Sequence, residues 1–317
     1  MSKKHTLDGF FQPAVQAKKI RLTASSETSN HDTYPYSVPK LPPEITEILS
    51  FSPADEGKLI NDKPDLDLYY FSPYVSKDIE KELFSFLREN LFFYRVQYSI
   101  KRGPVETQIN TPRYTTVFGV DESSTFGAEG HLLDAQSGKP VPRDRYKCRP
   151  RPIPDCLETL RKITEGTTGE KFNFCLVNYY ASGNDSISYH SDDERFLGPN
   201  PAIASFSFGV KRDFLMKHKP AKKDGKQIEI DSKPIRFELK SGDMILMRGP
   251  TQSNWLHSIP KRKGGDVDKG RINITFRRAM VRGGTDNYYQ YNVGTGIAFR
   301  WDAVKKDMVP WKHDSHS

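Results

Sequence analysis

The sequence predicts an α+β fold in which helices lie outside an antiparallel β sandwich or barrel. Apolar residues recur at helical spacing in two early segments, whereas the later part of the chain contains short β-rich runs separated by Gly, Pro, Asp and Lys clusters. Helices followed by strands are typical of the α+β class. With 317 residues and 12% aromatic residues, the chain is long enough to bury one large core.

Two helices are expected before the β-rich part. The first follows Ser76, a candidate N-cap, because Ile79, Leu83, Phe86 and Leu87 then recur on one face. The second follows Pro154 and Asp155, with an apolar face made by Leu157, Leu160 and Ile163.

The β core is expected from six runs rich in β-branched and aromatic residues. Each is short, and turn residues separate it from the next. They span residues 172–180, 202–210, 212–218, 235–240, 243–248 and 271–278.

The chain divides into three parts by composition. Residues 1–62 are rich in Ser, Thr, Pro, Lys and Asp with little periodicity, which predicts a disordered tail. Residues 63–280 form the expected domain. Residues 281–317 include Trp301 and Trp311, so this extension is too aromatic for a free tail, and we expect it to pack on the barrel.

Composition also limits the partners and the compartment. A formal net charge of +8 favours an anionic partner, nucleic acid first. The three cysteines have no CxxC spacing, which favours a reducing, intracellular compartment. Because no run of about 18 apolar residues and no secretory signal is found, we expect a soluble, non-secreted protein without a membrane partner.

The segment "NYYASGNDSISYHSDDE" (178–194) carries a candidate metal site. His190 and Asp192 are separated by one residue, so their side chains project to the same side at a strand end. His257, in "SNWLHSIP", is the best candidate for a third ligand. Two imidazoles and one carboxylate form the facial arrangement of non-haem Fe(II) oxygenases, although the same set also binds Zn²⁺ in hydrolases. Taken alone, an HxD pair is more often a surface turn.

The run "RINITFR" (271–277) predicts an anion site. In a strand, Arg271, Asn273, Thr275 and Arg277 point to one face, where a core strand would carry apolar residues. The two arginines are too far apart to stack on one carboxylate, but they could reach the two ends of a small diacid. Asn178 and Tyr180 add neutral hydrogen-bonding groups from another strand. The alternative is an exposed edge strand or a phosphate-binding surface.

These blocks, with "WLHSIP" between them, resemble the AlkB family of iron- and 2-oxoglutarate-dependent nucleic-acid dealkylases over about residues 65–280, most closely its nuclear members that repair duplex DNA. The resemblance implies a double-stranded β-helix, or jelly roll. It also implies Fe(II) held by His190, Asp192 and His257, and O₂ as oxidant. The co-substrate 2-oxoglutarate would lie on the six polar residues of the two strands: Asn178, Tyr180, Arg271, Asn273, Thr275 and Arg277.

The implied reaction is removal of alkyl groups from N-alkylated bases in DNA, such as 1-methyladenine and 3-methylcytosine. Decarboxylation of 2-oxoglutarate to succinate would be coupled to hydroxylation of the alkyl group, which leaves as formaldehyde. A base inside a duplex must first be flipped out of the stack.

The resemblance also implies substrate-binding residues. Phe126 is assigned as the aromatic that stacks on the base, with Phe118 and Tyr114 as alternatives. Asp193 and Glu194 resemble the substrate-side acids, and Arg113 resembles the arginine that pairs with the first of them. Residues 95–113 depart from the family because they are longer than its base-probing hairpin and lack a recognisable apolar tip.

The amino-terminal residues suggest partners. Leu7, Phe10 and Phe11 resemble the peptide box that docks on the sliding clamp PCNA, although Lys4 replaces the usual Gln. Lys18, Lys19 and Arg21 form a candidate nuclear import signal. Lys-rich stretches, including 216–226, suggest contacts with phosphates, and solvated surface loops are the alternative. We expect a nuclear monomer.

Three other functions fit the sequence less well. The first is a demethylase of RNA or single-stranded DNA from the same family. The second is a catalytically idle module that binds nucleic acid or the clamp, which the full metal and arginine sets disfavour. The third is a zinc hydrolase, which leaves the inward-facing arginines unexplained.

Overall fold

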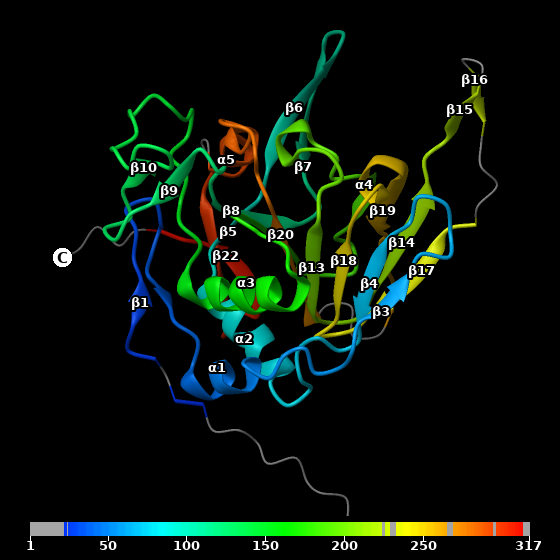
Figure 1. The fold of residues 1–317 in the computed structure, drawn as a ribbon. Helices are drawn as coiled ribbons and strands as arrows, with labels where there is room; N and C mark the ends of the chain where they lie inside the picture. The colour runs from blue at the N-terminus through cyan, green and yellow to red at the C-terminus, as the bar shows by residue number, and fades with distance from the viewer. Residues whose placement is uncertain are drawn as a thin grey trace, which may run out of the picture.

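The computed structural model describes residues 22–23, 25–223, 226–228, 233–264, 269–293 and 296–312. Two antiparallel sheets pack against each other, and helices cover the outer face of the larger sheet (Figure 1). This arrangement confirms the predicted helices outside an antiparallel β core.

The larger sheet has ten strands and contains four of the six predicted runs. The strands are, in spatial order, β22 (Asp307–Pro310), β21 (Ala298–Asp302), β5 (Phe93–Tyr94), β8 (Tyr114–Gly119), β11 (Phe174–Tyr180), β20 (Arg271–Arg277), β13 (Ile203–Gly209), β18 (Met244–Met247), β4 (Leu68–Phe71) and β3 (Lys58–Ile60). The pair β21 and β22 extends this sheet at one edge, where Ala298 pairs with Tyr94. The expectation that the carboxyl-terminal extension packs on the barrel is therefore confirmed.

The smaller sheet has four strands and contains the other two predicted runs. In spatial order they are β12 (Ile187–His190), β19 (Trp255–Ile259), β14 (Arg212–His218) and β17 (Ile235–Leu239). Apolar side chains of both sheets form one cluster, in which Phe174 and Ile245 of the larger sheet accompany Phe214 and Trp255 of the smaller one. The core between the sheets is thus continuous with the site described below.

Two of the helices are those predicted from sequence. They are α2 (Glu80–Asn90) and α3 (Asp155–Thr168), and the others are α1 (Pro43–Leu49), α4 (Thr251–Asn254), α5 (Asp286–Val293) and the 3₁₀ helix η1 (Arg195–Leu197). The N-cap of α2 is Ile79 and not Ser76 as predicted. The Ser76 hydroxyl instead accepts a hydrogen bond from the Asp78 amide in the preceding turn. Among the described residues, no helix has both the length and the apolar character needed to span a membrane.

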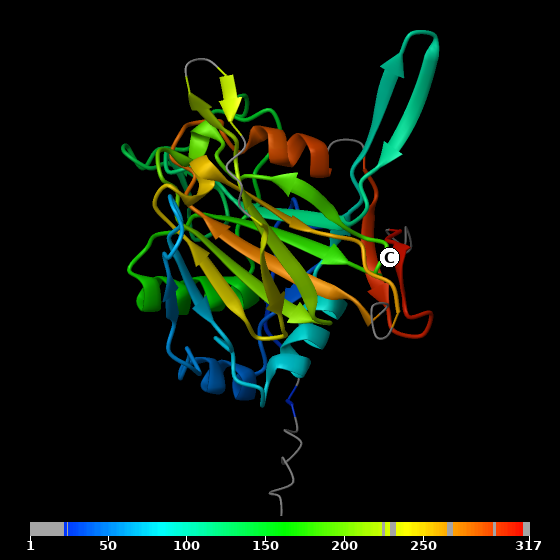
Figure 2. The same cartoon turned by 90° about the vertical axis from the view of Figure 1, so that its right-hand side faces the viewer.

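Four two-stranded antiparallel pairs lie outside the two sheets among the described residues. They pair β1 (Thr28–Ser29) with β2 (Val38–Pro39), β6 (Gln97–Arg102) with β7 (Val105–Asn110), β9 (Ser124–Phe126) with β10 (Leu132–Asp134), and β15 (Ala221–Lys223) with β16 (Lys226–Ile228). The β6–β7 hairpin stands out from the body of the protein (Figure 2). Val105, directly after its turn, is 60% exposed. An apolar residue therefore does occupy this tip, which the sequence had not revealed.

The segment before residue 63 belongs to the fold from Ser25 onward. Val38, Leu41 and Ile45 are buried in the cluster beneath the larger sheet. The Tyr34 hydroxyl donates to the Pro152 carbonyl at 2.6 Å. The expected disorder therefore does not extend to these residues, because a few apolar anchors tie an otherwise polar segment down. Residues 1–21 lie outside the described part of the chain.

Strand β20 separates two environments by its alternation. Ile272, Ile274 and Phe276 face the helices in the outer cluster. Arg271 and Arg277 belong to the opposite set, and both are almost completely buried. The predicted polar face is thus an interior one, and the alternative of an exposed edge strand is wrong because β11 and β13 pair with β20 on both sides.

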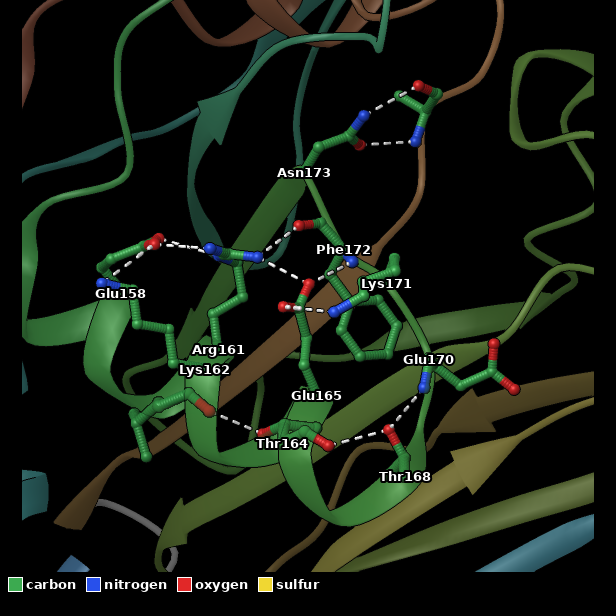
Figure 3. Close-up of polar contacts among 12 residues, drawn as sticks. Glu158, Arg161, Lys162, Thr164, Glu165, Thr168, Glu170, Lys171, Phe172 and Asn173 are labelled. Atoms are coloured by element: carbon green, nitrogen blue, oxygen red, sulfur yellow. Dashed lines mark hydrogen bonds and ion pairs between the residues drawn. The ribbon is translucent and has the colours of Figure 1, made fainter. Parts of the chain in front are cut away.

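Polar contacts tie α3 to the start of β11 (Figure 3). Arg161 on α3 donates to the Phe172 carbonyl, and the Phe172 amide donates to Glu165. Next along the chain, the Asn173 side chain donates to the Ala279 carbonyl at 3.0 Å and accepts from the Ala279 amide at 2.7 Å. Asn173, directly before β11, therefore fixes the position of Ala279, two residues after the end of β20.

Candidate active site

The three predicted metal ligands meet between two strands of the smaller sheet. His190 ends β12, and it lies directly opposite His257 on β19. Asp192 follows in the loop, with its carboxylate oxygens 3.8 Å from His190 Nε2 and 3.6 Å from His257 Nε2. One ligand atom from each residue lies within 4.8 Å of the other two. The spacing suits one ion held by all three side chains.

Neighbouring groups orient these ligands. The Nδ1 atom of His190 lies 2.9 Å from the Ser188 carbonyl and donates to it, which leaves Nε2 turned toward Asp192. The Gln252 side chain accepts from the Asp192 amide at 3.0 Å. The His257 ring stacks on Phe214. Both histidines are therefore held with a fixed ring orientation, as metal-binding imidazoles usually are.

Burial and charge set the protonation of the buried ligands. Burial lowers the pKa of His257 to about 3 even though Asp192 opposes the shift, so this imidazole is neutral. Burial by itself would raise the pKa of Asp192, but the neighbouring positive charge, chiefly that of Arg277, outweighs it and the pKa is lowered. A neutral imidazole and an ionised carboxylate are the forms that coordinate a cation.

A cavity of about 980 Å³ lies beside the three ligands. Its lining includes all six side chains predicted for the diacid: Asn178, Tyr180, Arg271, Asn273, Thr275 and Arg277. The two sheets thus contribute opposite walls of one cavity, with the metal ligands on one wall and the arginines on the other.

The two arginines differ in their partners. Arg271 contacts the Ser207 hydroxyl and lies over the Tyr180 ring, and its Nη1 atom is buried with no hydrogen-bond partner among the described residues. Burial lowers the pKa of Arg271 to about 10, so the side chain stays cationic near neutral pH. Arg277 places Nη2 3.1 Å from Asp192 Oδ1. A buried cation with an unpaired donor suits an anionic ligand in the cavity.

Three of the other four polar residues have hydrogen-bond partners within the sheet. Asn273 donates to Ser205 and to the Phe206 carbonyl, and Thr275 donates to the Leu176 carbonyl. The side-chain oxygen of Asn178 accepts from Thr115 at 2.9 Å. Burial raises the pKa of Tyr180, so its hydroxyl remains protonated. Asn273 and Thr275 thus line the cavity while their donors stabilise neighbouring strands.

Comparison with known proteins agrees with this geometry. The model of the family described as the 2OG-Fe(II) oxygenase superfamily matches residues 67–277. The chain belongs to this superfamily. The two packed sheets are accordingly its double-stranded β-helix, and Fe(II), 2-oxoglutarate and O₂ are the reactants that this family uses.

Curated relatives of this 2OG-Fe(II) oxygenase share part of its sequence. The human protein named DNA oxidative demethylase ALKBH2 is 42% identical over 132 residues, which cover 42% of this chain and 49% of that protein. The Arabidopsis thaliana protein of the same name is 37% identical over 142 residues, covering 41% and 44%. The human alpha-ketoglutarate-dependent dioxygenase alkB homolog 3 is 39% identical over 121 residues, covering 38% and 41%. The matches span about half the length of these relatives or less.

The residues of this oxygenase fit the reactants of the family. His190, Asp192 and His257 would hold the iron, and the unpaired Nη1 of Arg271 would bind a carboxylate of 2-oxoglutarate. A zinc hydrolase would have no role for this buried donor. The family match and the polar lining of the cavity together exclude the interpretation of the three ligands as a hydrolytic zinc site.

The substrate-side predictions are only partly supported by the structure of the oxygenase. Phe126 contacts His31, and Phe118 is fully buried against Phe92, so neither ring lines the cavity. The rival Tyr114 packs against Phe299 in the outer cluster. Aromatic residues in strands can face either side of a sheet, and none of these three lines the cavity beside the metal ligands.

The predicted charged residues also differ in their positions. Glu194 lines the cavity, and its Oε2 atom is buried with no partner among the described residues. Asp193 is half-exposed and pairs with Lys219 at 2.6 Å. Arg113 lines the cavity but donates to Asn178 at 3.3 Å, so the expected pairing of Arg113 with Asp193 is wrong. Lys219, directly after β14, takes this carboxylate instead.

One wall of the cavity was not predicted. Residues Arg282 to Tyr288, beyond the matched part of the chain, line it together with the two sheets. Tyr288 on α5 contacts Arg277 and Glu194. The signal was the aromatic segment "NYYQYNVG" directly after β20, which is unusual for a free tail.

Proposed function

We propose that this 2OG-Fe(II) oxygenase removes alkyl groups from N-alkylated bases in DNA, with 1-methyladenine and 3-methylcytosine as the expected substrates. The observation that carries the proposal is the carboxylate of Glu194. Its Oε2 atom is buried and unpaired at the cavity that holds the three metal ligands. Such an acceptor suits the exocyclic amine of a flipped, positively charged base. The similarity to proteins named DNA oxidative demethylase supports the same conclusion.

Bound Fe(II) and 2-oxoglutarate would supply the oxidising chemistry, in which O₂ converts the co-substrate to succinate and CO₂ while the alkyl group is hydroxylated and leaves as formaldehyde. The protein holds the parts in place. Arg271 binds the far carboxylate of the co-substrate, and Arg277 fixes the orientation of Asp192. The apolar side chains Leu176 and Phe214 line the same cavity and exclude water from the reacting atoms.

Access to a base requires contact with the nucleic-acid backbone. Lys217 lies on β14, the strand that pairs with β19 beside His257, and Lys219 follows directly after that strand. Lys147 and Arg195 also line the cavity. These cations would bind phosphates on either side of a flipped nucleotide, which costs a few kcal/mol to unstack and least where methylation already blocks pairing. The exposed Val105 at the tip of the β6–β7 hairpin would probe a duplex, which favours duplex DNA over single strands.

The remaining sequence predictions form part of this proposal. The enzyme acts as a nuclear monomer, and Lys18, Lys19 and Arg21 serve as its import signal. Leu7, Phe10 and Phe11 dock on the sliding clamp PCNA. All six residues lie outside the described part of the chain, so their support is the sequence pattern alone.

The proposal is tested with protein purified without O₂ and supplied with Fe(II), ascorbate and 2-oxoglutarate. Formaldehyde and succinate are measured on 3-methylcytosine in duplex DNA, in single-stranded DNA and in RNA. His190→Ala and Arg277→Ala should abolish turnover, whereas His131→Ala, at an exposed histidine outside the cavity, should not. Preference for single strands or RNA would establish the alternative substrate. Iron and 2-oxoglutarate binding without turnover on any of the three would establish the idle nucleic-acid or clamp-binding module.

A further inference from the structure

The carboxyl-terminal wall of the cavity is held in place by contacts with three separate parts of the chain: the residue before β11, the 3₁₀ helix η1 and the loop after β8. Asn173 pairs with both backbone polar groups of Ala279. The Met280 amide donates to the Phe196 carbonyl at 2.7 Å, and the Gly283 amide donates to Asp121 at 3.0 Å. These contacts bring α5 across the cavity. The wall is therefore part of the packed structure and lies beyond residue 277, where the family match ends.

Tyr288 on this wall lies between two residues with different tasks. Its hydroxyl accepts a hydrogen bond from Arg277 Nη1 at 2.8 Å and donates one to Glu194 Oε1. Glu194 Oε1 and Arg277 Nη1 form an ion pair at 3.9 Å, which is longer than a hydrogen bond, and without the hydroxyl the carboxylate could move into direct hydrogen-bond contact with the guanidinium. The ring is fixed by edge contacts with Phe174 and Phe196. The hydroxyl is thus a spacer between an acid and a cation.

We propose that Tyr288 is a positioning residue that holds the Glu194–Arg277 ion pair at 3.9 Å and keeps the two side chains from making a direct hydrogen bond. With the spacer present, Glu194 keeps its Oε2 atom toward the cavity for the substrate, and Arg277 keeps its guanidinium on Asp192 and the co-substrate side. Without it, the carboxylate closes on Arg277 and competes with 2-oxoglutarate for the cation. The role of Glu194 toward the base rests on the proposed function. The role of Arg277 depends only on 2-oxoglutarate, the co-substrate of the family.

The test measures 2-oxoglutarate binding by calorimetry to the full-length Fe(II) protein without O₂, so it needs no nucleic acid. Tyr288→Phe removes one oxygen and keeps the packed ring. We expect the Kd for 2-oxoglutarate to rise roughly tenfold, the scale of one lost hydrogen bond to a charged group. In the double variant with Glu194→Gln, the competing charge is gone, and we expect the Kd to return to within about threefold of wild type.

Tyr289→Phe is the matched control. This neighbour on α5 is fully buried and its hydroxyl bonds the Gly119 carbonyl away from the cavity. The control should lower the melting temperature and leave the Kd unchanged. If Tyr288→Phe does not fold, Glu194→Gln alone, a change in a half-exposed loop, still tests the proposal. For this variant we expect a Kd for 2-oxoglutarate equal to or lower than that of the wild type.

Each contrary result overturns the proposal. These results are an unchanged Kd in folded Tyr288→Phe, a loss that Glu194→Gln does not relieve, an equal loss in Tyr289→Phe, or weaker binding by Glu194→Gln alone. Failure of the dealkylation assay would leave all four measurements interpretable, because none of them depends on the base.

Discussion

Arg277 Nη2 lies 3.1 Å from Asp192 Oδ1, so a residue of the co-substrate wall directly holds a metal ligand. Burial by itself would lower the pKa of Arg277, but the Asp192 carboxylate and its other acidic neighbours raise it. The guanidinium is therefore a permanent cation at this position. The metal site and the co-substrate site are linked by this pair, and a change in one is felt by the other.

Replacing Arg277 by Lys should reduce turnover on the order of 100-fold, because an ammonium cannot contact Asp192 and Tyr288 with the planar geometry of a guanidinium. Succinate release and iron binding both check this expectation. Arg278→Lys is the matched control, since the next residue along the chain faces solvent and pairs with Glu122. Equal losses in the two variants would contradict a specific role for Arg277.

Arg271→Met should remove the stabilisation that 2-oxoglutarate confers without lowering the stability of the ligand-free protein. The reason is the buried Nη1 atom, which lacks a partner until an anion binds. Thermal unfolding with and without 2-oxoglutarate measures both effects.

Arg212→Met provides the contrast for that experiment. Arg212 is also buried, but it donates to three backbone carbonyls, those of Ser182, Asp185 and Pro260. Its loss should lower the free energy of unfolding by about 3 kcal/mol whether or not 2-oxoglutarate is present. If Arg271→Met behaved in the same way, Arg271 would have a structural role only.

The two neighbouring acids should respond differently to neutral substitutions. Glu194→Gln is expected to slow dealkylation of 3-methylcytosine roughly tenfold, because an amide is a weaker acceptor than a buried carboxylate. Asp193→Asn should change kcat/KM by less than about threefold, since an exposed ion pair contributes at most about 1 kcal/mol. Steady-state kinetics on one oligonucleotide compare the two directly, and a larger effect at Asp193 would restore its predicted contact with the substrate.

The hairpin tip should distinguish duplex from single-stranded substrates. Val105→Asp places a charge at an exposed apolar position, and we expect turnover on methylated duplex to fall at least about tenfold through the cost of burying that charge against stacked bases. Activity on single strands should remain within about twofold. Thr107→Asp, further along the same hairpin, carries the same charge and serves as the control. Parallel losses on both substrates would show that the hairpin acts in another way.

The site was predictable where local spacing determines geometry. His190 and Asp192 are two residues apart, and the alternation of "RINITFR" separates Arg271 and Arg277 from Ile272 and Ile274 in any strand. The spacing of apolar residues also predicted two helices, and the short β-rich runs predicted the β core. These features need no knowledge of distant contacts.

The features that failed depend on distant contacts. Phe118 and Phe126 were assigned to the substrate, but only the packing of β8 and β9 decides that they face Phe92 and His31. The amino-terminal segment looks disordered because its anchors, such as Ile45, are few and widely spaced. The position of Tyr288 depends on the contact of Asn173 with Ala279, which lie 106 residues apart along the chain.

The alternation of β20 has a genetic consequence. Substitutions at Ile272, Ile274 or Phe276 weaken the packing under the helices, so their phenotype should be loss of the protein at raised temperature. Substitutions at Arg271 or Arg277 leave that packing intact and remove activity from a protein that still persists in the cell. On the proposed function, alleles of the second kind keep the cations beside the cavity, such as Lys147 and Arg195, so they should occupy damaged DNA and interfere with the wild-type copy. One strand of seven residues would thus produce recessive, temperature-sensitive alleles at alternate positions and dominant ones between them.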